Sequence, residues 1–423
     1  MKRVLSVLVA AAIASGCAAA TKTLPPGQPI ALGFSPEGLA AIAPALQAYV
    51  DSGKLSGITA VITRHGQIAY EQEFGWSDLN KKKPLERDDV FRIYSMTKPI
   101  TSAAVMRLVD QGKLSLDDPV SKFIPGFANV KVFAGGSADQ PILRDADSPM
   151  TIRQVLTHMS GLAYGTTSSP VDTIFKRAKM YDAAYTTQFF ADSLAHLPLV
   201  FSPGTGWNYS SGIDLAGRIV EVASGKPLDR FFQDELFTPL GMKHTGFRKK
   251  GYLKHHLTKL YQKGPDGSIQ EVGNDGLQAM YDKKAKFFWG SGGLLSTIDD
   301  YLRFTQMLLN HGVLDGVRVL SDASVTEMTR NQLPASLIPI PMGDRGYGFG
   351  LAMSVLVDTT VARRPGPAGI YRWSGYVGTY FWNDPRNDMT AMVWTQFSPG
   401  STYPLERDFQ KLVYSALLNT PTR

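Results

Sequence analysis

The chain has 423 residues, of which 43% are apolar and 19% charged, and its formal net charge is +7. This composition is too apolar for a disordered protein, and the length allows two or three domains or one two-lobed unit with a large core. The one cysteine excludes an internal disulfide framework and a cysteine-based zinc site. No apolar run of about 18 residues follows the N-terminus, which excludes a polytopic membrane protein.

Residues 1–20 are predicted to be an export signal, because a basic start precedes the short apolar stretch Val4–Ile13 and then small residues. Two processing sites remain open. Gly16-Cys17 resembles a bacterial lipobox, in which lipidated Cys17 would tether the chain to a membrane, and the alternative is cleavage after Ala20. A third interpretation, a buried apolar start of a cytoplasmic domain, is less favoured. We therefore expect a periplasmic protein or a lipoprotein anchored in the outer membrane.

The positive charge is concentrated between Lys243 and Lys286, a segment that contains ten Lys and Arg but four acidic residues. Such a stretch suits either an anionic lipid surface or a solvated face, and we favour the solvated face. The pair His255-His256 within it is interpreted as surface residues and not as metal ligands. No basic motif interleaved with aromatic residues occurs, so a nucleic acid is not expected as a partner.

The N-terminal part of the mature chain mixes helical and strand-like patterns. Residues 21–34 are rich in proline and glycine and are predicted to be a tether. The spacing of apolar residues then predicts these elements in order: a helix over Pro36–Ser52, strands over Ile58–Thr63 and Gln67–Phe74 joined by a turn, a short run over Phe91–Tyr94, and a helix over Thr97–Val109.

The middle of the chain, to about residue 285, is loop-rich and helical, and the last part returns to strands. The predicted elements are helices over Ile213–Ser224 and Asp229–Leu236, strands over Gly350–Val357, Tyr371–Trp382 and Met389–Gln396, and a closing helix over Glu406–Leu418. This order predicts an α+β fold in which both termini build one antiparallel sheet flanked by helices, with an inserted, mainly helical lobe. The domain is expected over 35–420, with an α/β lobe of 35–94 and 287–420 and a helical lobe of 95–286.

The common hydrolase motifs are absent: no nucleophile elbow, His-Glu-x-x-His or P-loop occurs. One pattern remains, Ser95-Met96-Thr97-Lys98, in which Ser95 is the only serine with lysine three positions later. Ser95 follows a predicted strand and opens a helix, so Lys98 lies one turn on and on the same face. A partly desolvated lysine can be neutral and accept the serine proton, and the helix N-terminus favours the alkoxide. The alternative is that Ser95 caps the helix and Lys98 is exposed.

A second element is the turn-rich segment Pro203–Ser211, just before a predicted helix. Tyr209 in this segment can point into a cleft. Near a lysine cation its phenol would ionise more readily and could serve as a base. The alternative is a buried tyrosine whose hydroxyl is satisfied by a hydrogen bond.

Together with the segment Leu156–Leu162, these two elements resemble the class C β-lactamase-like serine hydrolases of the penicillin-binding-protein-like superfamily. Further segments agree and extend the resemblance over about residues 36–420: Ser224–Leu228, Phe237–Met242, Gly292–Thr297 and Tyr347–Gly350. The family contains β-lactamases, D-Ala-D-Ala peptidases, D-aminopeptidases, acyltransferases and family VIII carboxylesterases. The resemblance implies a β-lactamase/transpeptidase-like fold and neither a cofactor nor a metal ion.

Carried over by position, the resemblance implies Ser95 as the nucleophile and Lys98 as its proton acceptor. Tyr209 would be the second base, which activates water for deacylation. The third family motif, Lys-Thr-Gly, is matched by Trp373-Ser374-Gly375. By analogy, the backbone N–H groups of Ser95 and Tyr376 would form the oxyanion hole.

Two departures from the family pattern affect the expected substrate. Trp373 replaces the lysine that attracts a β-lactam carboxylate, and Ser211 replaces the asparagine that binds the amide side chain. We expect both residues to contact substrate, together with Ser374 and Gly375. An indole favours flat or apolar groups, and tryptophan in this motif is typical of the esterases in the family. The chain is therefore most similar to family VIII carboxylesterases. His158, in the Leu156–Leu162 segment, is interpreted as structural.

The leading hypothesis is a carboxylesterase for small or short-acyl esters that works through a Ser95 acyl-enzyme, with weak β-lactam hydrolysis as a side activity. The alternative is a β-lactamase, a D-Ala-D-Ala carboxypeptidase or a D-aminopeptidase that acts on cell-wall peptides. A remote alternative is a non-catalytic envelope binding protein. The expected partner is a small-molecule ester, and we expect a monomer because no heptad pattern stands out.

Overall fold

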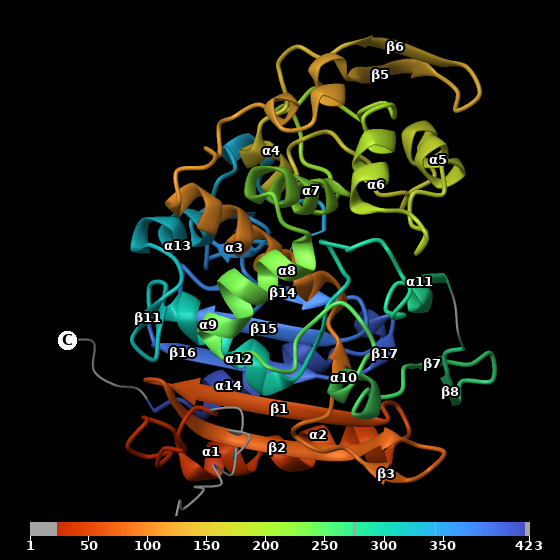
Figure 1. The fold of residues 1–423 in the computed structure, drawn as a ribbon. Helices are drawn as coiled ribbons and strands as arrows, with labels where there is room; N and C mark the ends of the chain where they lie inside the picture. The colour runs from red at the N-terminus through yellow and green to blue at the C-terminus, as the bar shows by residue number, and fades with distance from the viewer. Residues whose placement is uncertain (1–22, 274–275, 343, 419–423) are drawn as a thin grey trace, which may run out of the picture.

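The computed structural model describes residues 23–273, 276–342 and 344–418. The predicted signal peptide, with Cys17, lies outside these residues. Figure 1 shows a sheet-containing lobe built from both ends of the chain and, on top of it, a lobe of short helices. None of the helices in the described ranges has both the length and the apolar character needed to span a bilayer.

The main sheet has eight strands in the order β12-β13-β14-β15-β16-β1-β2-β3, and every neighbouring pair is antiparallel. β1 pairs with β16 in the register Thr59↔Trp394, so the first strand lies beside the last one of the sheet. The predicted sheet from both termini is thus confirmed. The strands are β1 (Gly57–Arg64), β2 (Gln67–Asp78), β3 (Lys83–Pro84), β12 (Tyr347–Phe349), β13 (Ser354–Leu356), β14 (Tyr371–Gly375), β15 (Thr379–Asp384) and β16 (Met389–Trp394).

Both faces of this sheet are covered. Helices α1 (Pro36–Ala40), α2 (Ile42–Asp51) and α14 (Leu405–Ala416) cover one face, and α12 (Ile298–Leu309) packs on the other (Figure 1). Successive side chains of β16 point to opposite faces, so Met392 and Trp394 enter one core cluster and Ala391 and Val393 the other. This double burial explains why the strand is apolar throughout.

The helical lobe is organised around α3 (Thr97–Asp110), which packs against α7 (Gly212–Ser224) and is buried along most of its length. Between β4 (Phe91–Arg92) and β9 (Leu295–Ser296), the other elements are η1 (Tyr94–Met96), η2 (Val120–Lys122), η3 (Pro125–Asn129), β5 (Lys131–Gly136), β6 (Pro141–Asp145), α4 (Ile152–Leu156), α5 (Pro170–Arg177), α6 (Thr187–Leu194), α8 (Leu228–Phe232), the π-helical η4 (Gln233–Phe237), α9 (Thr238–Leu240), α10 (Tyr252–His255), β7 (Tyr261–Lys263), β8 (Ile269–Glu271) and α11 (Gly276–Ala279).

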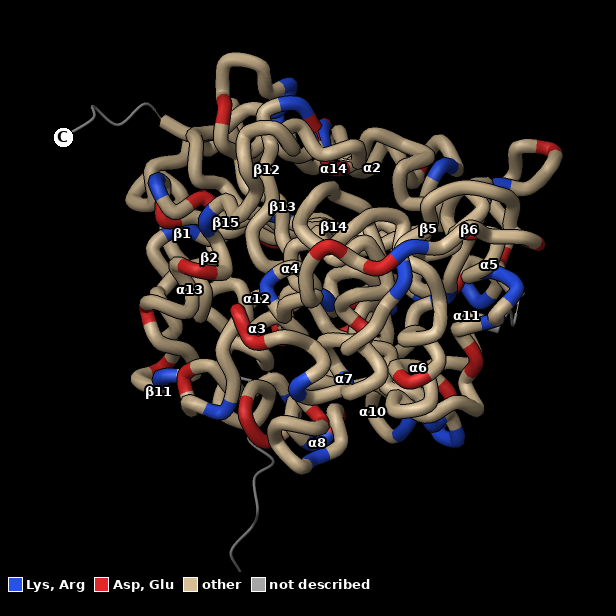
Figure 2. Tube along the Cα trace, turned by 90° about the horizontal axis from the view of Figure 1, so that it is seen from above, with Lys and Arg blue, Asp and Glu red and all other residues tan. Residues whose placement is uncertain are grey.

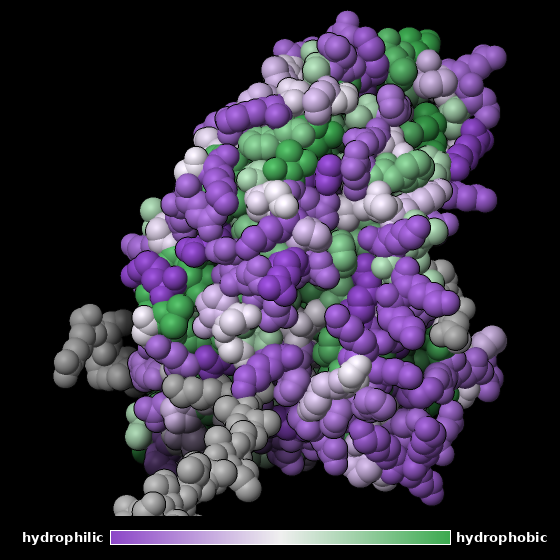
Figure 3. Space-filling model, viewed as in Figure 1, coloured by the Kyte–Doolittle hydropathy of each residue, from purple (hydrophilic) through white to green (hydrophobic). Residues whose placement is uncertain are grey.

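The remaining elements lie outside the main sheet: β10 (Val313–Leu314), β11 (Val317–Arg318), α13 (Asp322–Thr329), η5 (Ala335–Leu337), β17 (Phe397–Ser398) and η6 (Gly400–Thr402). Figure 2 shows acidic and basic residues interspersed along the trace, and Figure 3 shows a largely hydrophilic face with apolar residues between the polar ones. In the basic stretch, Lys249 pairs with Asp282 and Lys259 with Glu271. His255 is exposed and His256 is half-buried.

Three predicted segments differ from the structure. Tyr371–Trp382 is not one strand but two, β14 and β15, because the chain reverses at Tyr376–Gly378, where Gly378 has a φ of +87°. Only Ser354–Leu356 of the predicted strand Gly350–Val357 pairs in the sheet. The described part of the predicted tether is packed on the domain: Leu24, Leu32 and Phe34 are buried, and Gly27 N–H donates to the carbonyl of Ile68.

Candidate active site

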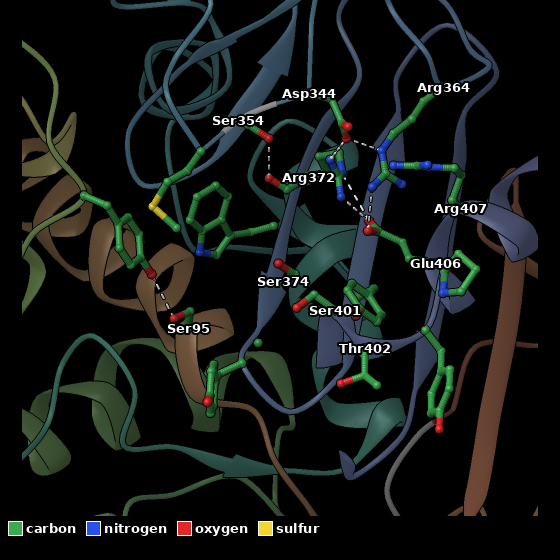
Figure 4. A pocket seen from close by; sticks show the side chains of 18 of the residues that line it. Ser95, Asp344, Ser354, Arg364, Arg372, Ser374, Ser401, Thr402, Glu406 and Arg407 are labelled. Carbon is green, nitrogen blue, oxygen red and sulfur yellow. Dashed lines mark hydrogen bonds and ion pairs between the residues drawn. The ribbon is translucent and has the colours of Figure 1, made fainter. Parts of the chain in front are cut away.

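A cavity of about 630 Å³ runs along β14 on the sheet side of the boundary between the lobes (Figure 4). Its wall includes Ser95, Tyr209 and the run Trp373–Tyr376, and it continues toward the N-terminus of α14. The cavity therefore unites three motifs that lie far apart in the sequence, around Ser95, Tyr209 and Trp373.

Ser95 lies in the single turn η1, directly before α3. The turn reverses the chain sharply: Tyr94 has a φ of +40°, and its ring is held in edge contacts with Tyr281 and Trp289. The carbonyl of Met96 accepts a hydrogen bond from the Tyr301 hydroxyl. This packing fixes Ser95 at the N-terminus of a 14-residue helix, where the helix dipole stabilises negative charge.

Lys98 and Tyr209 both reach the Ser95 hydroxyl. Lys98 Nζ lies 3.2 Å from Ser95 Oγ and donates to the carbonyl of Ser291 at 2.9 Å. The Tyr209 hydroxyl donates to Ser95 Oγ at 2.9 Å. Lys98 Nζ also lies 4.7 Å from the centre of the Tyr209 ring, a cation–π distance. The structure thus brings together the three residues predicted to be catalytic.

Lys98 is fully buried, so the alternative of an exposed lysine is wrong. Burial penalises the charged ammonium and lowers its pKa to about 7, although the negative charge of Asp214 opposes this shift. A substantial fraction of Lys98 is then neutral at physiological pH. A neutral amine within hydrogen-bond distance of Ser95 Oγ can accept the serine proton.

Tyr209 behaves differently from the sequence-based expectation. Burial raises the pKa of its phenol well above the ordinary value, and the negative charge of Asp214 acts in the same direction. The expectation that a nearby lysine makes this phenol ionise readily is therefore wrong, because desolvation outweighs that attraction. Tyr209 is a neutral hydrogen-bond donor to Ser95, which suits it to pass protons on.

The third motif forms the cavity wall next to Tyr209. The Trp373 ring lies 5.8 Å from the Tyr209 ring and 5.3 Å from the Phe349 ring. Gly375 approaches the turn before Ser95 so closely that a Cβ there would lie 2.4 Å from the Ile93 carbonyl oxygen. Only glycine allows this approach. Ser374 lines the same cavity.

Tyr376 follows β14 and is also on the cavity wall. Its carbonyl accepts a hydrogen bond from Gly400 N–H at 2.7 Å, and its ring lies 6.1 Å from that of Tyr94, which precedes the nucleophile. These contacts hold the backbone of Tyr376 near the nucleophile turn. The position suits the predicted oxyanion-hole donor.

Ser211 does not contact the cavity. It is fully buried, and its hydroxyl donates to the carbonyl of Ala163 at 2.9 Å. The expectation that Ser211 binds substrate is wrong, because the shorter side chain is held in the loop before α7. His158 is also buried, with a φ of +61°, and Ser210 N–H donates to its Nδ1 at 3.2 Å. Burial lowers the pKa of His158 well below its ordinary value, which fits a neutral packing residue.

A buried network that the sequence motifs do not indicate lies behind Lys98. Asp214 Oδ1 accepts the Ser291 N–H at 2.7 Å, and its Oδ2 accepts the Ser291 hydroxyl and the Tyr181 hydroxyl, each at 2.8 Å. Tyr164 Oη lies 3.3 Å from Ser291 Oγ. Asp214 thereby fixes the segment whose carbonyl holds Lys98. An acidic residue within the apolar helical run Ile213–Ser224 was the available signal.

The comparisons with known proteins agree with this site. The sequence model of the Beta-lactamase family matches residues 42–415, which include all the motifs above. The chain belongs to the β-lactamase family. It is 30% identical to esterase EstB of Burkholderia gladioli over 86% of this chain and 91% of that protein. It is 35% identical to protein Rv1367c of Mycobacterium tuberculosis over 82% and 88% of the two chains.

Among solved structures, the hydrolase EstCE1, described as having promiscuous acyltransferase activity, superposes with a TM-score of 0.78 at 26% identity, over 91% of this chain and all of that one. These relatives confirm the class C-like fold and the similarity to family VIII carboxylesterases. The chain is thus a serine hydrolase of the β-lactamase family. In the described ranges, no group of three or more His, Cys, Asp or Glu side chains is arranged to hold a metal ion.

Proposed function

We propose that this β-lactamase-family hydrolase is a carboxylesterase for small, short-acyl esters. The observation that carries the proposal is Trp373, which places an indole beside Ser95 and Tyr209 on the cavity wall, where the family pattern has a lysine. The esterase relatives support the reaction class. An aromatic wall binds apolar acyl and alcohol groups and supplies no charge-assisted contact at this position.

In the acylation step, Ser95 Oγ attacks the ester carbonyl carbon and its proton moves to neutral Lys98. The oxyanion accepts hydrogen bonds from the backbone N–H groups of Ser95 and Tyr376. The tetrahedral intermediate then breaks its bond to the alcohol oxygen. Tyr209 gives that oxygen its phenol proton and takes one from the Lys98 ammonium, so an alcohol leaves and an acyl-enzyme remains.

In the deacylation step, a water molecule attacks the acyl carbon. Tyr209 takes a proton from the water while its own proton goes to the departing Ser95 Oγ. The net change is the addition of water across the ester bond, and all three side chains return to their starting protonation states. This relay keeps the expected role of Tyr209 toward water without a free phenolate.

The test is a paired assay on the purified chain, with p-nitrophenyl butyrate beside the chromogenic cephalosporin nitrocefin. We expect fast ester cleavage, slow or no nitrocefin turnover, and no ester turnover in Ser95→Ala. Unchanged ester turnover in that variant would contradict the mechanism. Efficient nitrocefin turnover, or faster cleavage of D-Ala-D-Ala peptides than of esters, would favour a cell-wall substrate. Failure to react with a fluorophosphonate probe would favour a non-catalytic binding protein.

We also propose that the chain is exported and carries lipid on Cys17. The support is the basic and apolar N-terminal pattern followed by Gly16-Cys17. Labelled palmitate should be incorporated into the full-length chain and not into Cys17→Ser. Release of an unlabelled protein cleaved after Ala20 would instead favour ordinary secretion.

A further inference from the structure

Positive charge is concentrated on one side of the helical lobe, outside the cavity that contains Ser95. Two segments, 176–189 and 282–288, contain six basic and two acidic residues, and none of these residues lines that cavity. The first segment joins α5 to α6, and the second follows α11. Figures 1 and 2 both place these helices on the same side of the molecule, and Figure 2 shows basic residues beside α5 and α11.

Hydrogen bonds hold the two segments against each other. The Lys286 N–H donates to the carbonyl of Ala183 at 2.8 Å, and the Phe288 N–H donates to Thr187 Oγ1 at 3.3 Å. Residues that are about 100 positions apart in the sequence therefore present their charges on one packed surface.

Five lysines carry the excess charge, and we call them the basic patch. They are exposed and form no ion pair with any residue that the structure describes: Lys176, Lys179, Lys283, Lys284 and Lys286. The other charged residues of the two segments are Arg177, which pairs with Asp139, Asp282, which pairs with Lys249, and the exposed Asp182. Unpaired like charges on one surface repel one another, and an anionic surface would relieve this repulsion.

Aromatic rings extend the same surface. Phe189 lies in the first turn of α6 and is 50% exposed, and its ring centre lies 4.4 Å from that of Tyr185, which is half-buried. An apolar ring that is left in water is unfavourable unless a partner covers it. Lysines beside exposed aromatic rings are typical of surfaces that lie in the headgroup region of a membrane.

A second cavity, of about 390 Å³, adjoins the basic patch. Lys176 and Lys179 line it together with Phe175, Met180 and Tyr181. Cations beside apolar side chains match a phospholipid, which has an anionic phosphate next to apolar chains. A lipid surface thus accounts for the lysines, the aromatic rings and the cavity, whereas a soluble polyanion accounts for the lysines alone.

We propose that the basic patch docks this protein on a membrane surface that contains anionic phospholipids. The lysines contact the phosphates, and the Phe189 ring lies among the headgroups. The sequence pattern alone favoured a solvated face for the stretch Lys243–Lys286. The structure adds the second segment and the aromatic rings, which change that interpretation. The inference goes beyond the proposed esterase function, and it does not rest on a lipid at Cys17.

The test is co-sedimentation with vesicles of equal parts phosphatidylcholine and phosphatidylglycerol, with pure phosphatidylcholine vesicles as the neutral reference. The protein begins at Thr21, so that neither the predicted signal segment nor a lipid on Cys17 contributes to binding. All helices and strands of the described structure lie within this chain.

Two triple variants lose the same charge at different places. The patch variant carries Lys283→Gln, Lys284→Gln and Lys286→Gln. The control variant carries substitutions at three exposed lysines outside the patch: Lys54→Gln, Lys113→Gln and Lys411→Gln. A third variant, Phe189→Ala, removes the exposed ring and keeps every charge.

We expect the parent chain to bind the anionic vesicles more tightly than the neutral ones, and this binding to weaken as salt is added. The patch variant should bind at least about tenfold more weakly, because each lysine near an anionic surface contributes up to about fivefold. Phe189→Ala should bind several-fold more weakly, and the control variant should bind like the parent. Circular dichroism spectra, which do not depend on esterase activity, should be the same for all four proteins.

Equal binding of the parent to both kinds of vesicle would refute the proposal, and so would an equal loss in the patch and control variants. Unchanged binding of Phe189→Ala, together with full competition by soluble polyphosphate, would assign the lysines to a soluble polyanion and refute docking on a membrane.

Discussion

Asp214→Asn is the substitution that most directly tests how the buried network tunes the catalytic lysine. Asp214 contacts neither Ser95 nor the cavity wall, yet its charge raises the pKa of Lys98 while burial lowers it. The carboxylate accepts three hydrogen bonds, from Tyr181 and from the N–H and hydroxyl of Ser291. Asparagine has the same shape and removes only the charge, because the two hydroxyl partners can rotate to accept from its amide.

The expected magnitude follows from the geometry. An opposite charge within about 4–6 Å shifts a pKa by about 1–3 units. Because Ser291 separates Asp214 from Lys98, we expect the lower limit of about one unit, or about 1.4 kcal/mol. The pKa of Lys98 should therefore fall from about 7 toward about 6 in the variant. The base is active when neutral, so the rate rises with pH through this pKa, and the rise should begin at lower pH in the variant.

The assay is the pH profile of kcat/KM for p-nitrophenyl butyrate, which reports the free enzyme. At pH 6 the parent should retain about a tenth of its plateau rate and the variant about half of its own plateau. Other groups near Lys98 are Tyr164, Tyr209 and His158, and burial keeps all three neutral across this range. None of these three is expected to titrate in this window. Asp214 does, because burial raises its pKa to about 6, so the acid limb of the parent belongs to the coupled pair of Asp214 and Lys98, and that of Asp214→Asn to Lys98 alone.

Asp300→Asn is the matched control for this experiment. Asp300 is also a buried carboxylate, whose pKa burial raises to about 6, but it accepts from His244 and Thr245 and does not line the cavity. Its substitution should leave the profile of the parent unchanged. An unmoved acid limb with a lower plateau in Asp214→Asn would show that Asp214 only positions Ser291, and the electrostatic argument would be refuted.

Three further substitutions test individual contacts of the site. Tyr209→Phe removes the proton relay and should lower kcat for p-nitrophenyl butyrate about 10²–10⁴-fold with an unchanged circular dichroism spectrum; a loss below tenfold would exclude the relay. Gly375→Ala places a Cβ 2.2 Å from Thr379 Oγ1 and should reduce the free energy of unfolding by about 1–3 kcal/mol in urea titrations, whereas equal stability would mean that the turn can move. Trp373→Ala removes ring contacts with Tyr209 and Phe349 and should raise KM for the butyrate ester more than for the acetate ester.

Much of the fold could be predicted because its signals are local. The hairpin of β1 and β2 follows from two strand-like runs and from the turn between them at His65-Gly66, where both residues have a positive φ. The Tyr371–Trp382 strand was predicted too long because both sides of the turn at Tyr376–Gly378 are apolar. The succession of elements predicted that both termini share one sheet. The order of its strands was not predicted, because it depends on contacts between residues more than 300 positions apart, for example Thr59 and Trp394.

The catalytic residues were predictable by type and position, but their protonation was not. Whether Lys98 and Tyr209 ionise depends on burial by segments far away in sequence, such as the one that contains Ser291. Ser211 was predicted to contact substrate because of its position in the motif. Its short side chain instead donates a hydrogen bond to the carbonyl of Ala163 and does not reach the cavity. Motif spacing identifies which backbone positions face a cleft, whereas the reach and charge of each side chain require the packed structure.

Burial has opposite consequences for the two groups that contact Ser95. It lowers the pKa of the Lys98 ammonium and raises that of the Tyr209 phenol, so the same desolvation makes both side chains neutral. A neutral amine accepts a proton and a neutral phenol donates one, which is the pair needed to remove a proton from the serine and deliver one to the leaving alcohol. A more solvated site would hold an ammonium and could not start the reaction. The rings of Tyr164 and Tyr209, whose centres lie 5.5 Å and 4.7 Å from Lys98 Nζ, are part of the packing that keeps this base dry.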